Sequence, residues 1–328
     1  MATRIEDGVL WLDPMSVDTT EVEVTATDPG GLIAIQRFRA WVVPAPDPDA
    51  FNIELYFDPG FTAEEEAAVR RAAERWMEVV TGDLPDVPAK EPLSDGCVGG
   101  PSPLRVVGVI DDVLIRMRFV ARLGRNAASA ATCGRREESG YAFLGRSSFA
   151  MWHFRNPDPV LDRLYRSTLH EIGHVLGFGD WVYDSHPPAW RALFRAHDGD
   201  GHFTGPLAVA AFDAAGGEGY TGGKVPLEDR IPILNIHWRG RVIPGDVMSV
   251  GGGSLLTAIT IQALADLGYE VDVSKADPYA LPGQAQGDFW DAGAHGDAMP
   301  TELLANDVIV VRVMVVLRVC KVVRVIGP

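Results

Sequence analysis

The chain has 328 residues, of which 47% are hydrophobic and 23% charged, an ordinary composition for a soluble globular protein with room for two domains. Its formal net charge of −16 predicts a surface that repels phosphate backbones, which argues against a nucleic-acid-binding protein. Basic residues interrupt the longest apolar segment, 308–326, so we expect no transmembrane segment.

The three cysteines, Cys97, Cys133 and Cys320, are too few for a disulfide scaffold and lack the spacing of a zinc ribbon. Cys97 and Cys133 would pair in an exported protein, and three unpaired thiols are the alternative. The start of the chain, MATRIEDGVLWLDP, has no basic segment followed by an apolar run, so no signal peptide is visible there.

Residues 1–44 are predicted to be β-structure. The segment TEVEVTATDPGGLIAIQRFRAWVVP has two alternating runs around the turn DPGG, the pattern of a hairpin. It resembles the closing hairpin of a cadherin-like or immunoglobulin-like repeat, of which only about half would fit before Pro44. We therefore expect the chain to begin inside a larger precursor, with the Pro- and Asp-rich residues 45–49 as a linker.

The next predicted elements are a strand at 51–58 and a helix at 62–81. Thr62 is a good N-cap, glutamates fill the first turn, and Gly82 ends the helix. Its expected apolar face consists of Val69, Ala72, Ala73, Trp76 and Val80. A second strand is predicted at 111–123, with one face made of Val113, Ile115, Met117 and Phe119.

The second half of the chain alternates turn-rich segments with helical patterns. Residues 124–145 give no clear element, and 147–154 are predicted as a short strand. A long helix is expected at 159–178, capped by Asp158. Further helices are predicted at 189–196, 206–214 and 255–267, the last ended by Gly268. The tail 283–328 is poorly assigned, although β-branched residues after 307 predict a strand pair or a poorly ordered end.

The stretch TLHEIGHVLGFGDW, residues 168–181, contains two histidines four positions apart. On a helix this spacing brings His170 and His174 to one face, where both imidazoles can bind one ion such as Zn²⁺. Glu171 would lie beside the ion and accept a proton from water whose pKa the metal lowers. Histidines on the apolar background IGHVLGF would otherwise lack a partner, which favours a metal site.

Gly177 allows a positive φ, so the helix can end there and the chain can turn beneath the metal. The pattern H-E-x-x-H-x-x-G resembles that of the metzincin clan of zinc peptidases. This resemblance implies a methionine turn under the site. GDVMSVGGG, residues 245–253, is similar to that turn, with Met248 as a packing floor for the imidazoles.

Two residues compete as the third ligand. Asp180 follows Gly177 by three positions, where metzincins place a ligand, and His237 lies upstream of Met248 in NIHWRGRVIPGDVMS. Asp180 could instead hydrogen-bond the turn or orient a ligand imidazole.

A more specific resemblance covers residues 50–282. The segments FNIELYFDPGFTAEEEAAVRRAAERWMEVVTGDLPDV, TLHEIGHVLGFG, FTGPLAVAAF, VPLED, HW and LTAITIQALADLGYEVD occur in the order of a bacterial relative of leishmanolysin. In that family an insertion precedes the third histidine, which tryptophan follows, as Trp238 follows His237. The resemblance therefore assigns the third ligand to His237, with Asp180 as the alternative.

The resemblance also implies the fold and the activity. It implies an α+β metzincin fold with a twisted mixed sheet, one catalytic Zn²⁺, and a secreted or cell-surface endopeptidase acting on proteins or peptides. We expect a monomer. The cysteine-rich C-terminal part of the protozoan enzymes is absent, which leaves the substrate range open. The rival function is a zinc-stabilised adhesion or binding module, and the intact Glu171 argues against it because a structural zinc closes its fourth position with a protein ligand.

Two other polar groups have weaker readings. HDGDGHFTG, residues 197–205, places Asp198 and Asp200 like the opening of a Ca²⁺ loop, but the later glutamate ligand is missing, so a plain loop is favoured. His153 is interpreted as a structural histidine, with a position on an edge strand near the cleft as the alternative.

Overall fold

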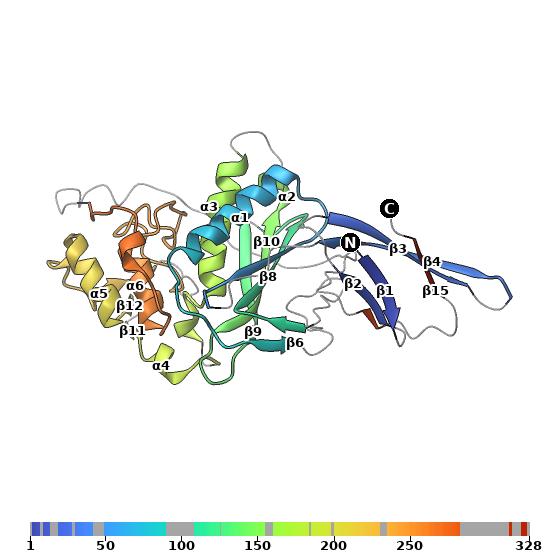
Figure 1. Ribbon diagram of the computed structural model, residues 1–328. Helices are drawn as coiled ribbons and strands as arrows, with labels where there is room; N and C mark the ends of the chain where they lie inside the picture. Colours follow the sequence, from blue (N-terminus) through green and yellow to red (C-terminus); the bar gives the residue numbers. More distant parts are fainter. Residues whose placement is uncertain are drawn as a thin grey trace. The chain divides into compact units, whose positions relative to one another are not determined.

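The computed structural model describes residues 2–6, 9–13, 19–27, 30–41, 49–89, 108–124, 126–154, 160–183, 185–197, 200–229, 235–282, 315–316 and 323–326 (Figure 1). The chain divides into two compact units. The terminal unit comprises Met1–Asp47, Pro85–Asp111 and Leu303–Pro328, and the central unit comprises Pro48–Leu84 and Asp112–Glu302. Within the described ranges, no helix is both long and apolar enough to cross a bilayer.

The described part of the terminal unit consists of short antiparallel sheets. β1 (Ala2–Glu6), β2 (Val9–Asp13) and β14 (Val315–Val316) form one, and β15 (Val323–Ile326), β3 (Thr19–Thr27) and β4 (Ile33–Trp41) form another. β6 (Val87–Ala89) pairs with β7 (Gly108–Ile110). Thr27 lies opposite Ile33, which confirms the predicted hairpin. The strands of the tail pair with N-terminal strands rather than with each other. A cadherin-like repeat in this region stays a prediction.

The central unit is built on a mixed four-stranded sheet with the order β5 (Ile53–Phe57), β8 (Val113–Val120), β10 (Ala142–Ala150), β9 (Ala128–Arg135). β5, β8 and β10 are parallel, and β9 runs antiparallel at the edge. The predicted inner face of β8 is confirmed, because all four of its apolar residues are buried: Val113, Ile115, Met117 and Phe119. β9 fills the stretch for which the sequence predicted no element. Its residues are small or polar and half-buried along their whole length, so they carry no period-2 signal.

Two helices, α1 (Ala63–Met77) and α3 (Val160–Val175), pack together against this sheet (Figure 1). α1 begins as predicted at Thr62, whose hydroxyl accepts from the Glu65 backbone while the Glu65 carboxylate accepts from the Thr62 N–H, a capping box. Trp76 of α1 is fully buried and donates from Nε1 to the Leu169 carbonyl of α3 at 2.8 Å. This contact ties the helix that carries the two histidines to the core.

The remaining elements follow the sheet. α2 (Met151–Phe154) is one helical turn directly after β10, so the predicted strand at 147–154 is right only to Ala150. α4 (Pro188–Arg191) is followed by β11 (Phe194–His197), which pairs with β12 (Asp200–Phe203), so the helix predicted at 189–196 is wrong in its second half. Pairing with β12 overrides the helical propensity of that segment. Further elements of the central unit are, in chain order, α5 (Pro206–Phe212) with a π-helical turn Asp213–Gly217, β13 (Val225–Pro226) and α6 (Ala258–Asp266).

Trp76→Ala should lower the free energy of unfolding by about 3–5 kcal/mol, because it empties a large buried site and leaves the Leu169 carbonyl without its donor. Urea unfolding followed by far-UV circular dichroism measures the change. Glu74→Ala, at an exposed position of the same helix, is the control and should stay within about 0.5 kcal/mol of the parent. Equal stability of the two variants would contradict a core formed between α1 and α3.

Candidate metal centre

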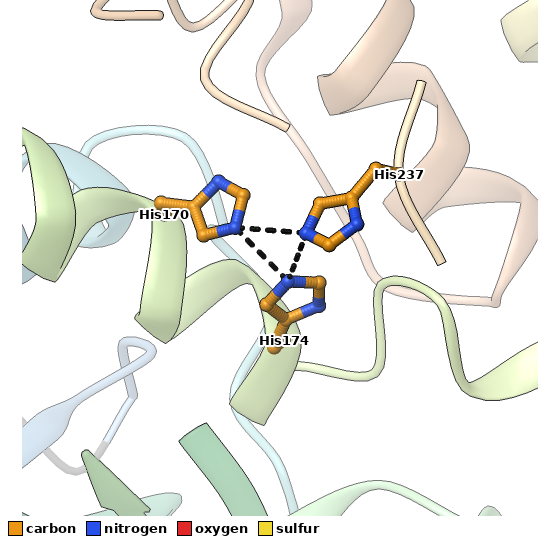
Figure 2. A group of neighbouring side chains, drawn as sticks. All are labelled: His170, His174 and His237. Carbon is orange, nitrogen blue, oxygen red and sulfur yellow. Dashed lines mark hydrogen bonds between the residues drawn. The ribbon is translucent and has the colours of Figure 1, made fainter. Parts of the chain in front are cut away.

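Three histidine side chains converge on one point. His170 and His174 lie one turn apart on α3, and His237 lies in the segment after residue 235. Their Nε2 atoms are 3.1 Å apart in all three pairings (Figure 2). The ring of His237 is nearly parallel to that of His170, at 13°, and the His174 ring is nearly perpendicular to both, at 83° and 86°.

The proton positions on two of these rings leave lone pairs facing inward. Nδ1 of His170 donates to the Val247 carbonyl at 2.6 Å, and Nδ1 of His174 donates to the Phe178 carbonyl at 2.9 Å. Each Nε2 therefore carries a lone pair and no proton. Burial lowers the pKa of His170, and burial followed by the nearby His170 lowers the pKa of His174 to about 3, so both rings stay neutral at pH 7.

Two neutral rings in these tautomers cannot hydrogen-bond through their Nε2 atoms, so the 3.1 Å separation between His170 and His174 is repulsive by itself. A cation between the nitrogens removes that repulsion. Three nitrogens at this spacing can each lie about 2.0–2.1 Å from one Zn²⁺, the usual zinc–imidazole distance. The donor set and its geometry therefore fit a zinc ion.

The turn after α3 fixes the orientation of His174. The Gly177 N–H donates to the His174 carbonyl and the Phe178 N–H donates to the Gly173 carbonyl, both at 3.0 Å, which is the Schellman pattern of helix ends. Gly177 has φ of 104°, a conformation that residues with a Cβ avoid. The turn presents the Phe178 carbonyl to the His174 ring, so a glycine outside the site sets the direction of one candidate ligand.

Met248 lies under the same helix and is fully buried. A Cβ added to Gly173 would lie 2.5 Å from the Met248 sulfur, so the methionine packs against α3 between the two histidines. The Trp238 N–H donates to the Met248 carbonyl at 2.9 Å, and the Val250 N–H donates to the Trp238 carbonyl at 3.2 Å. These bonds join the turn that carries Met248 to the segment that carries His237.

Asp246 organises the turn that carries Met248. Its carboxylate accepts from the Met248 N–H at 2.7 Å and from the hydroxyls of Thr257 and Thr260 at 2.6 and 2.7 Å. Burial raises the pKa of Asp246 to about 6, against the lowering effect of these hydrogen bonds. The next residue, Val247, supplies the carbonyl that orients His170.

Arg239 anchors the segment that carries His237. Its side chain is buried, and its Nε donates to the Leu227 carbonyl at 2.8 Å. The guanidinium also pairs with Asp200 and, at 3.3 Å, with Asp229. The third histidine is thereby tied to β12 and to the loop after β13.

Asp180, the alternative third ligand, has other partners. Its carboxylate pairs with Arg135 at 2.7 Å and approaches His186 at 3.5 Å. Burial raises the pKa of Asp180, and the positive charge of Arg135 opposes that shift. Among the described residues, the side chain that lies with His170 and His174 in a group able to hold a metal ion is that of His237, and Asp180 does not belong to this group.

A cleft with a volume of about 550 Å³ opens beside the histidines. Glu171, which is 6% exposed, lines it together with His170 and His237. Burial raises the pKa of Glu171 to about 8. The cleft is also lined by the segment 249–253 and by Ala127, Ala128, His153, Arg163, Arg166 and Ser167. His153 reaches it from the helical turn α2 rather than from an edge strand.

Two other predictions fall partly outside the described residues. Asp198, of the possible Ca²⁺ loop, lies outside them. The carboxylate of Asp200 pairs with the Arg239 guanidinium and lies 3.6 Å from His202, so its charge is balanced by an arginine.

Cys133 is disulfide-bonded. Both other cysteines of the chain lie outside the described residues, so its pairing with Cys97 stays a prediction.

Asp246 and Arg239 did not emerge from the sequence. Asp246 had a weak local signal, because an aspartate two residues before a turn residue can accept from that backbone N–H. Arg239 had none, because its partners lie in other loops and the pairing depends on the tertiary fold.

Comparison with known proteins gives one informative similarity. No family model matches the chain. In an alignment of length 202 that covers 56% of this chain, the sequence is 24% identical to the human protein named ciliated left-right organizer metallopeptidase. The match covers 26% of that protein, so the chain spans about a quarter of its relative's length.

Gly177→Ala should destabilise the protein by about 1–3 kcal/mol through backbone strain, and more because the new Cβ would lie 2.7 Å from the buried Trp190 ring. Misdirection of the Phe178 carbonyl should also weaken zinc binding by about 10–100-fold. Thermal unfolding and zinc competition with a chromophoric chelator measure the two effects. Gly60→Ala is the control, since it has the same sign of φ, 113°, and open space around it. Unchanged zinc affinity in Gly177→Ala would contradict an orienting role of the turn.

Proposed function

We propose that this protein is a zinc-dependent endopeptidase of the leishmanolysin-like metzincin type, with residues 50–282 as its catalytic region. The observation that carries the proposal is the meeting of three imidazole Nε2 atoms, 3.1 Å apart, beside a buried carboxylate in an open cleft. The similarity to a protein named as a metallopeptidase supports it independently.

His170, His174 and His237 would hold the ion. Bound Zn²⁺ supplies Lewis-acid chemistry, which polarises a peptide carbonyl and lowers the pKa of water. The three histidines leave the cleft side open to substrate, as a catalytic zinc site requires. Gly177, Met248 and Asp246 act through the ligands by fixing the end of α3 and the turn beneath it.

Glu171 is the proposed general base. It lies next to His170 in the chain, lines the cleft, and is screened from bulk water. Its carboxylate would take a proton from the attacking water and deliver it to the leaving amine. Burial raises the pKa of Glu171, which makes its carboxylate a stronger base than an exposed one, and a cation held by the adjacent histidines would oppose that shift and keep the carboxylate ionised.

The substrate would bind as an extended peptide beside β9. That strand is last in the order of the sheet, and its first residue, Ala128, lines the cleft. An extended peptide can add to such an edge through main-chain hydrogen bonds. We further propose that the protein acts outside the cell or on its surface, as the family resemblance implies, and the disulfide at Cys133 supports this location.

The competing proposal is a zinc-stabilised binding module without turnover. A purely structural zinc closes its coordination with a fourth protein ligand. In the described part of the chain, the histidine group has three members and borders an open cleft, which favours the catalytic proposal.

Glu171→Ala should abolish hydrolysis of a quenched fluorogenic peptide library while one equivalent of zinc stays bound, because the variant loses the proton carrier and no metal ligand. Removal of zinc with a chelator should abolish hydrolysis of the parent protein, and added Zn²⁺ should restore it. Loss of zinc from Glu171→Ala would refute the assigned roles. A folded, zinc-loaded parent without hydrolysis would favour the binding module.

His237→Ala should weaken zinc binding by more than about 100-fold, because loss of a metal ligand costs more than loss of a residue that only hydrogen-bonds a ligand. Asp180→Ala should retain one equivalent of zinc, since its carboxylate pairs with Arg135. Metal content after dialysis checks both, and Asp180→Asn, which keeps an acceptor for Arg135, covers the case in which the alanine variant is unstable. The reverse result would make Asp180 the third ligand.

A further inference from the structure

The face of α3 that leads to the candidate metal centre is basic. Arg163, Arg166 and His170 are spaced three and four positions apart, so they lie along one side of the helix, and all three line the cleft. Arg166 is one helical turn, about 5.4 Å, from His170, and Arg163 is about one turn further away. Glu171, the proposed base, is the one carboxylate among the residues lining the cleft in the described ranges.

This local charge is opposite in sign to that of the whole chain, whose formal net charge is −16. A cleft lined by two arginines, beside a site for a divalent cation, attracts negative charge. Burial, followed by the charge of Arg163, lowers the pKa of His153.

Helix stability accounts for little of the position of Arg166. Arg166 pairs with Asp162 at 2.7 Å, but the two side chains are 39% and 59% exposed, and such pairs contribute little. An arriving carboxylate can therefore replace Asp162 at low cost and gain the two-pronged geometry that guanidinium offers.

We infer that the cleft selects peptides with an acidic side chain within about three residues of the scissile bond. The two arginines lie about one and two helical turns from His170, and an extended peptide covers that distance in about two to three residues at a rise of about 3.3 Å per residue. Arg166 is the main selecting residue, and Arg163 extends the basic surface. The inference rests on the proposed endopeptidase function, whose substrate class it names.

A binding measurement tests this inference apart from turnover. The zinc-loaded Glu171→Ala protein is titrated with labelled peptides that differ only by Glu or Gln at each of three positions on either side of a fixed central bond. At one or more positions, Glu peptides should bind at least about tenfold more tightly than Gln peptides, and added salt should weaken that preference. Arg166→Gln in the same background should reduce the preference to about twofold or less.

The matched control is Arg70→Gln. Arg70 forms the same i, i+4 type of pair, with Glu66 at 3.6 Å, at a similar 42% exposure, and it does not line the cleft. It should leave the preference intact. Arg166→Glu should reverse the preference toward Lys-containing peptides, which a merely structural arginine would not do.

Hydrolysis by the parent protein separates the two proposals. Cleavage of neutral and acidic peptides at equal rates, with equal binding, would overturn the acidic selection and leave the endopeptidase standing. Preferential binding of acidic peptides without hydrolysis would keep the selection and overturn the endopeptidase. If the Arg166→Gln variant still prefers Glu peptides to Gln peptides, another group of the protein binds the peptide carboxylate, and the role of Arg166 is overturned.

Discussion

The convergence of neutral imidazole nitrogens is the constraint on which the rest of this structure depends. Lone pairs held 3.1 Å apart repel each other until a cation lies between them, so the protein must hold the rings in place by other means. Two backbone carbonyls, from Val247 and Phe178, take the Nδ1 protons and fix two of the tautomers. Both carbonyls lie in turns that need particular residues, Gly177 in one and Asp246 in the other. The site thus rests on backbone geometry rather than on the ligand side chains alone.

Two buried polar networks transmit that geometry to the core. Asp246 joins the turn that carries Met248 to the start of α6 through Thr257 and Thr260. Arg239 joins the segment after His237 to β12 and its neighbouring loops. Because polar groups in a low-dielectric interior are costly when unpaired, networks with many satisfied bonds hold a single arrangement. They therefore hold the third histidine against a helix that is distant in sequence.

The cleft combines three surfaces with separate tasks. The candidate metal centre and Glu171 carry the proposed chemistry, and β9, whose first residue Ala128 lines the cleft, is the proposed strand edge for an extended peptide. The basic face of α3 then adds charge selection through Arg163 and Arg166. One helix therefore carries both the proposed catalytic residues and the proposed selecting residues, so their separation along the peptide is set by its rise of about 1.5 Å per residue.

Local patterns in the sequence determined the elements that depend on short-range forces. The capping box at Thr62, the alternating β8 and the histidine spacing on α3 could each be read directly, because caps, strand period and helical period are properties of neighbouring residues. The sequence alone left His237 and Asp180 as rivals for the third position, and the family resemblance favoured His237. Only the tertiary structure decided which of them lies beside His170 and His174, and it also placed β9 at the sheet edge and formed the cleft that the arginines line, because those relations join residues far apart in the chain. Their energies come from pairing and burial, which no local window of sequence contains.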